Sequence, residues 1–303
     1  MSALHKKAWL RGGLLYLSLL APAAAWAQDS CPPEGTDASS LALLKETGFA
    51  VDDDTRRTLA LALLDCLGSP DPKLRDGVAY EAFTVWLRGG QLPPELRGQL
   101  RDRLYAMLQQ ADEDGFRQSF AALVLSEVAR TDRMGMWMTS KERVAMVKAA
   151  TTYLQSVQDY RGFDDGQGWR HAVAHGSDWL LQLALNPAVE RAQLDQILAA
   201  LATQVVPEAP HAYVFGEPGR LARPVVAIAK RGLLTEADWT AWFDALPKRI
   251  GDPAQAYTDS GWLARRHDLL AFLGNLYLEA DQSGDAYIKA LKVPVVATLK
   301  QVP

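Results

Sequence analysis

The sequence predicts an all-α fold in which antiparallel helix pairs stack into a curved, HEAT-like α-solenoid. Apolar residues recur three and four positions apart through most of the chain, as on the buried stripe of a helix. These amphipathic segments run for roughly ten to twenty residues between short breaks that contain glycine or proline. No stretch keeps the alternation of apolar and polar residues that half-buried strands require. Short connections favour antiparallel neighbours, and helix pairs of this kind stack into arrays.

Caps and breakers delimit the expected helices of the N-terminal half. Asp52 is the expected N-cap of the second helix, Gly89-Gly90 closes the third, and Pro93-Pro94 opens the fourth. A capping box, Thr139-Ser-Lys-Glu142, precedes the sixth. The expected helices, each with one apolar face, cover residues 39–47, 52–67, 72–88, 94–108, 116–128 and 140–154.

The C-terminal half follows the same pattern. Asn186-Pro187 ends one expected helix and starts the next, and Thr235 caps another. Pro224 lies inside an expected helix, so that helix starts there or kinks. A longer aromatic loop is expected at 207–219. The expected helices cover residues 169–185, 187–201, 220–230, 235–243, 262–278 and 286–299.

The stretch from Arg161 to Leu180 is the chemically densest part of the chain, with two of the five histidines and two tryptophans. Glycines make a loop of its first part, and the helix expected from Trp169 follows. At 100° per residue, His171, His175 and Asp178 share a narrow polar stripe. The opposite, apolar side includes Gly176, which permits close approach of another helix.

Three interpretations of the polar stripe stay open. His171 and His175, four residues apart on a helix, can share a divalent metal ion with Asp178 as a ligand or supporting partner. The metalloprotease pattern is absent, because Ala172 stands where that pattern has glutamate. The stripe can instead line a metal-free binding or catalytic pocket, with no cofactor. It can also be a structural network joined to a neighbouring helix.

Four further residues are candidates for the same groove, each with a structural alternative. Arg161 can border the groove from the preceding loop, and His267 can supply a third imidazole or belong to a surface basic cluster. Glu217 and Arg220 come just before an expected helix, where they can reach a ligand or cap the helix. With Trp169, these residues complete the predicted ligand-binding set.

The N-terminus has the pattern of a secretory signal peptide over residues 1–27. Lys6, Lys7 and Arg11 form the basic region, an apolar run follows, and small residues precede the cleavage site expected after Ala27. Residues 28–38 should form a flexible leader, and 39–303 a single helical domain. The protein is therefore expected in the periplasm or outside the cell, with no membrane span after cleavage.

The exported part contains both cysteines and an excess of acidic residues. Cys31 and Cys66 are expected to form a disulfide, which would hold the proline-rich leader against the helices. Loss of the basic signal segment makes the formal net charge of −4 still more negative. An acidic chain without a basic run argues against nucleic acid as the partner, which leaves an unidentified small molecule, peptide or protein.

The central run, Gly168-Trp-Arg-His-Ala-Val-Ala-His-Gly-Ser-Asp178, resembles the hallmark of a bacterial family known as domain of unknown function 2785. Residues 67–76 with Ala79-Tyr80-Glu81, and residues 263–272, are similar to its N- and C-terminal signatures. The sequence departs from the family pattern at Asp268, where asparagine is usual, and at Pro218-Gly219, which shortens an acidic segment. The resemblance implies an all-helical fold and supplies no activity.

Two functions follow from these features. The first is a binding or interaction protein whose concave helical face, centred on His171, His175 and Asp178, holds a ligand. The alternative is a hydrolase in which a histidine acts as general base and Asp178 orients it or binds a metal ion. The binding protein is the preferred hypothesis.

Export gives the first testable prediction. Expressed with its full N-terminus in a Gram-negative host, the protein should be recovered from the periplasm with Gln28 as its first residue, because signal peptidase cleaves after the small-x-small sequence ending at Ala27. Cell fractionation and N-terminal sequencing measure both properties. Recovery of the full-length chain in the cytoplasm would contradict the prediction.

Overall fold

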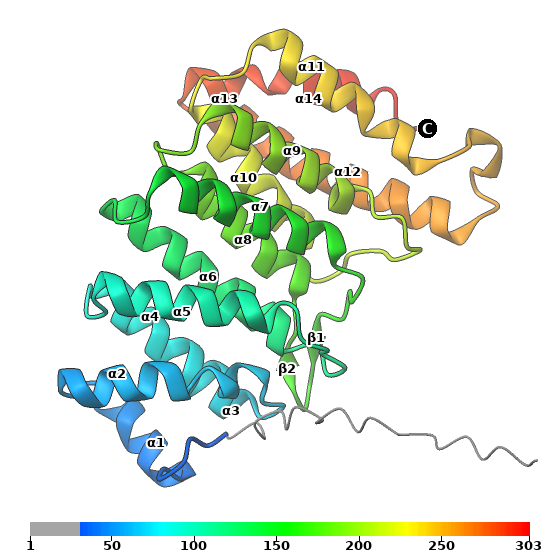
Figure 1. Ribbon diagram of the computed structural model, residues 1–303. Coiled ribbons are helices and arrows are strands. Elements are labelled where there is room, and N and C mark those ends of the chain that lie inside the picture. The colour runs from blue at the N-terminus through cyan, green and yellow to red at the C-terminus, as the bar shows by residue number, and fades with distance from the viewer. Residues whose placement is uncertain (1–30) are drawn as a thin grey trace, which may run out of the picture.

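The computed structural model describes residues 31–303, and the fold in this range is all-α (Figure 1). The signal peptide expected at 1–27 and the first residues of the leader lie outside the described residues. The N-terminal helices are α1 (Ala38–Glu46), α2 (Asp53–Ala62), α3 (Pro72–Leu74), α4 (Glu81–Arg88), α5 (Pro94–Met107), α6 (Arg117–Met134) and α7 (Ser140–Ser156). A π-helical segment, Arg75–Tyr80, joins α3 to α4, so the single helix expected there is locally widened.

The second half begins with a small antiparallel hairpin of β1 (Phe163–Asp164) and β2 (Gly168–Trp169), in which Phe163 pairs with Trp169. The helices that follow are α8 (Ala172–Ala184), α9 (Arg191–Val205), α10 (Glu217–Lys230), α11 (Glu236–Ala245), α12 (Ser260–Gln282), α13 (Ala286–Ala290) and α14 (Lys292–Leu299). None of the helices in the described part of the chain is long and apolar enough to cross a membrane.

The helices pack in two neighbouring rows. In one row, α6 packs on α8, α8 on α10, and α10 on α12. In the other, α7 packs on α9, and both also contact α8. The order along the stack follows the order in the sequence, from α1 at one end to α14 at the other (Figure 1). Helix α8 therefore has neighbours on several sides, and little of its surface is free.

The cap residues fix the helix starts as expected. The Asp52 carboxylate accepts hydrogen bonds from Asp54 N and Thr55 N, and Thr139 forms its capping box with Glu142. Thr235 forms a box with Asp238 in the same way. The start expected at Pro187 is wrong. Helix α9 begins at Arg191, because residues 186–190 form a turn, and the Gln193 side chain accepts a hydrogen bond from Glu190 N at the helix start.

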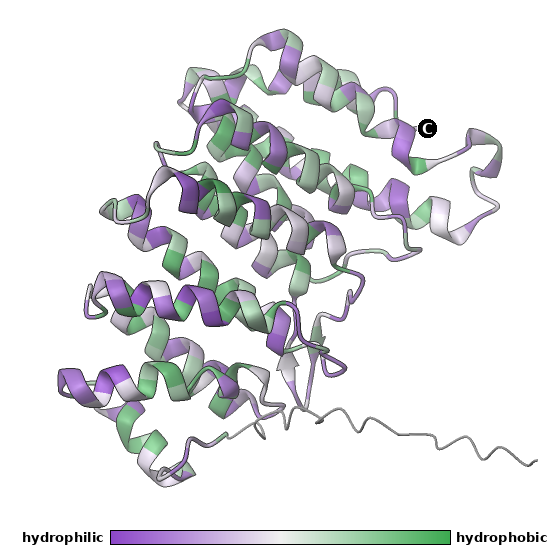
Figure 2. Cartoon of the chain, viewed as in Figure 1, coloured by the Kyte–Doolittle hydropathy of each residue, from purple (hydrophilic) through white to green (hydrophobic). Residues whose placement is uncertain are grey.

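The core uses large aromatic side chains and close helix approaches. Trp86, Trp179 and Trp262 are fully buried. Along each helix, hydrophobic and hydrophilic residues follow one another, as Figure 2 shows. Gly176 provides the close approach expected of it. A Cβ atom there would lie 3.0 Å from Leu154 Cδ1 and 3.1 Å from Tyr153 Cε1, so a larger residue would push α8 away from α7.

The expected disulfide is present. Cys31 and Cys66 are bonded, with their Cα atoms 5.0 Å apart. Cys66 is fully buried in the core beside α2, whereas Cys31 is partly exposed. The bond therefore attaches the start of the described chain to the first helices.

Loss of this bond gives the second prediction. The substitution Cys31→Ser should lower the free energy of unfolding by about 3–4 kcal/mol, because a cross-link between cysteines 35 positions apart restricts the unfolded chain. Cys31 is the better position to change, since substitution of buried Cys66 would also disturb packing. Denaturant unfolding measures the effect, and reductant should bring the wild-type protein to the stability of the variant. Two free thiols in the unreduced protein would contradict the bond.

Candidate functional site

The central motif is divided between the hairpin and α8. The helix expected from Trp169 begins only at Ala172, because the hairpin pairing continues beyond β2: Arg170 N donates to Gly162 O and His171 N to Arg161 O. His171 then adopts a left-handed conformation, with φ of 60°, to turn the chain into the helix. The Trp169 ring lies over this turn, with its centroid 4.5 Å from that of His171.

His171 and Glu217 form a buried pair between the start of α8 and the start of α10. His171 Nδ1 lies 3.4 Å from Glu217 Oε1, and both side chains are less than a tenth exposed. Glu217 also accepts a hydrogen bond from Phe215 N. Burial raises the pKa of Glu217, but the hydrogen bonds from His171 and from the backbone outweigh it and hold that pKa below its ordinary value. Glu217 is therefore a carboxylate at neutral pH.

His175 is buried against α6. Its Nδ1 lies 2.8 Å from Ser119 Oγ and 3.2 Å from the Ser119 carbonyl oxygen, and its ring meets the Phe120 ring edge-on. The Ser119 hydroxyl donates its proton to Arg170 O, so Ser119 Oγ can only accept a hydrogen bond from His175. The proton between Ser119 and His175 is therefore assigned to His175 Nδ1. Burial, followed by the charges of His171 and Arg220, holds the pKa of His175 well below its ordinary value. His175 is thus a neutral structural group.

Asp178 pairs with Arg220. Both donor groups of the Arg220 fork reach the carboxylate, with Nε 2.8 Å from Asp178 Oδ1 and the second nitrogen on Oδ2. The pair joins α8 to α10 and is partly buried. Asp178 is therefore occupied by a guanidinium and does not join the two histidines, whose ring centroids are 5.8 Å apart. Over residues 31–303, no group of three or more His, Cys, Asp or Glu side chains is placed to hold a metal ion.

Of the two remaining predicted residues, Arg161 lies near His171 and Glu217, whereas His267 does not line the same hollow. Arg161 is half exposed and pairs with Asp159 at the edge of a shallow hollow that His171 and Glu217 also line. His267 is exposed on α12, and its neighbour Asp268 is the buried residue, accepting a hydrogen bond from Tyr213 N. Burial raises the pKa of Asp268 to about 7, although the hydrogen bond from Tyr213 N lowers it. The charge of Glu217 adds to the increase.

Sequence reasoning assigned no role to two residues that complete the network. Arg75 is fully buried, donates to Gln167 O, pairs with Asp76 and lies over the Phe116 ring at 4.0 Å. It thereby attaches the hairpin to the N-terminal helices. Ser119 anchors His175, as described above. Arg75 lies within residues 67–76, which are similar to the N-terminal signature of the family named above. That similarity was the only feature of the sequence that indicated Arg75.

A groove lies beside the motif, with a volume of about 460 Å³. It runs between α8, α10, α12 and α13, and Arg220, the partner of Asp178, is at its edge. His171 and His175 do not line it. The lining residues are Leu181, Leu185, Gly216, Gly219, Arg220, Ala222, Arg223, Val226, Ala227, Lys230, Asn275, Glu279 and Ile288.

The fold and the buried motif define an all-helical protein, as the resemblance implies. The model of the family described as "Protein of unknown function (DUF2785)" matches residues 104–278, more than half of the chain. The chain belongs to this family. Comparison with curated proteins and with solved structures gave no match.

The burial of His175 gives the third prediction. The substitution His175→Ala should cost about 1–3 kcal/mol and lower the melting temperature by several degrees, because Ser119 loses its partner inside the core. The matched control is His267→Ala, which removes an exposed imidazole and should leave the melting temperature unchanged. Thermal denaturation of both variants makes the measurement. A His175 variant as stable as the wild-type protein would show that the contact does not support the fold.

Proposed function

We propose that the chain is an exported binding protein, a curved α-solenoid whose groove between α8, α10, α12 and α13 holds an amphipathic molecule with an anionic group. One observation carries this proposal: the groove combines apolar walls with exposed cations. Its volume of about 460 Å³ is in the range of small-molecule sites. The ligand is a molecule with an alkyl chain and a carboxylate or phosphate.

The cationic side of the groove comes from α10. Arg223 and Lys230 are exposed and line the groove, and Glu279 is its one acidic residue. Burial, with the charge of Arg223 as a second cause, lowers the pKa of Arg220. Arg220 and Arg223 lie three positions apart on one face of α10, so their like charges repel each other. An anion bound between them would relieve that repulsion.

The apolar side of the groove suits a hydrocarbon chain. Leu181 and Leu185 approach it from α8, Val226 from α10, and Ile288 from α13. Leu185 is 38% exposed, and a ligand on its surface would remove that apolar area from water. Cations beside such a wall favour an amphipathic anion over a purely polar one.

In this proposal the motif positions a side chain of the groove and does not contact the ligand. Asp178 holds Arg220 in a fixed orientation, so the motif shapes one edge of the groove without touching the ligand. The alternative, a hydrolase, needs His171 or His175 to reach a substrate. Both are buried, and His175 already uses Nδ1 inside the core, so the geometry favours binding over hydrolysis.

The fourth prediction tests the groove with octanoate, using 1-octanol as its neutral counterpart. Octanoate should bind more tightly, and the double variant Arg223→Gln, Lys230→Gln should bind it at least about tenfold more weakly, because two cations facing the carboxylate are lost. Isothermal titration calorimetry measures both affinities.

The control for this experiment is Lys148→Gln, which removes an exposed cation of α7 away from the groove. It should leave octanoate binding unchanged. Equal affinity for octanoate and octanol, or an unaffected double variant, would contradict the anionic class of ligand. Failure of the wild-type protein to bind either would contradict the groove.

A further inference from the structure

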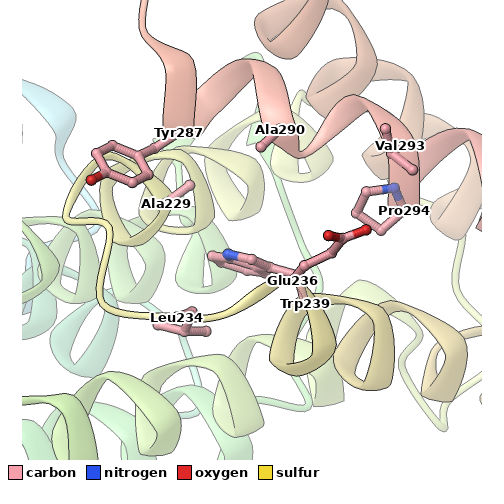
Figure 3. Close-up of a pocket in the computed structure, with 8 residues that line it drawn as sticks. All are labelled: Ala229, Leu234, Glu236, Trp239, Tyr287, Ala290, Val293 and Pro294. Carbon is pink, nitrogen blue, oxygen red and sulfur yellow. The ribbon is translucent and has the colours of Figure 1, made fainter.

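A second cavity, of about 310 Å³, lies at the C-terminal end of the stack between α10, α11, α13 and α14 (Figure 3). We propose that it binds a small organic cation, an alkylated ammonium group. Its lining is apolar and aromatic apart from one carboxylate. Its lining includes Glu236, Trp239, Tyr287, Val293 and Pro294.

Two aromatic residues line the cavity, and packing holds one of them in place. Trp239 is only 7% exposed, and its ring packs edge-on against Trp242 and at a tilt against Phe243. Tyr287 is 57% exposed and supplies a second ring from α13. Aromatic faces attract cations through their quadrupole, and a ring already fixed by packing loses little entropy when a ligand binds.

Glu236 gives the cavity its charge. It lies in the first turn of α11, but the capping box of that helix uses Thr235 and Asp238. Asp238 also takes the ion pair with Arg191. Within residues 31–303, the Glu236 side chain has no hydrogen bond or ion pair, and Figure 3 shows its carboxylate between Trp239 and Pro294. The cavity thus has an unneutralised negative charge beside aromatic and apolar surfaces.

These features select the chemistry of the ligand. A carboxylate beside the Trp239 ring stabilises a cation with apolar substituents, since the charge meets Glu236 and the alkyl groups meet Trp239, Val293 and Pro294. A strongly hydrated metal ion would find one carboxylate and no further oxygen ligands among the charged lining groups. An anion would be repelled, so this cavity and the cationic groove select opposite ligands.

The experiment uses choline as the probe and 3,3-dimethyl-1-butanol as its neutral counterpart, in which carbon replaces the charged nitrogen. Isothermal titration calorimetry on the purified protein should give an affinity for choline at least about tenfold higher than for the alcohol. Choline binding should weaken as salt is added, whereas alcohol binding should not.

The variant Glu236→Gln keeps the shape of the side chain and should reduce choline affinity at least about tenfold. The matched control is Glu95→Gln, which neutralises an exposed first-turn glutamate of α5 and should have no effect. Equal binding of choline and the alcohol, an unaffected Glu236 variant, or the absence of choline binding at millimolar concentration would overturn the proposal. The octanoate experiment probes different residues, so either site can fail without the other.

Discussion

The buried position of α8 is the constraint on which the rest of the structure depends. Helix α8 packs against α6, α7, α9 and α10, so its polar groups must find partners inside the protein. His175 meets Ser119 of α6, and Asp178 meets Arg220 of α10. His171 meets Glu217 just before α8 begins. These contacts fix the relative positions of α6, α8 and α10, which follow one another in one row. Loss of one partner would leave a buried polar group unpaired, which costs more stability than the pair contributes.

This constraint also decides where open space remains beside α8. His171 and His175 are buried and the Asp178–Arg220 pair is partly buried, so the chemically richest part of the sequence is not the most accessible part of the molecule. The groove lies further along α10, and Arg220 both lines it and pairs with Asp178 of the motif. A change at Asp178 would therefore reach the groove through Arg220, without any contact between Asp178 and the ligand.

The two cavities share a structural origin and differ in charge. Both use α10 and α13, with Ala227, Lys230 and Ile288 on the groove side and Ala229, Tyr287 and Ala290 on the other. Short helices at the end of a stack have fewer neighbours to cover their faces. Arg223 and Lys230 of α10 lie at one cavity and Glu236 of α11 at the other, so neighbouring apolar hollows have opposite electrostatic preferences.

The sequence by itself determined the helical class, most helix boundaries, the capping boxes at Thr139 and Thr235, and the pairing of Cys31 with Cys66. These features depend on local periodicity, on side chains three residues apart, or on a count of two cysteines. The sequence also located the motif. Periodicity placed His171 and His175 on a polar stripe, yet it does not reveal what faces that stripe. Only the tertiary structure decided that α6 and α10 cover it, since hydrogen bonds from His175 to Ser119 and the Asp178–Arg220 ion pair compensate the burial of polar groups on both sides of one helix.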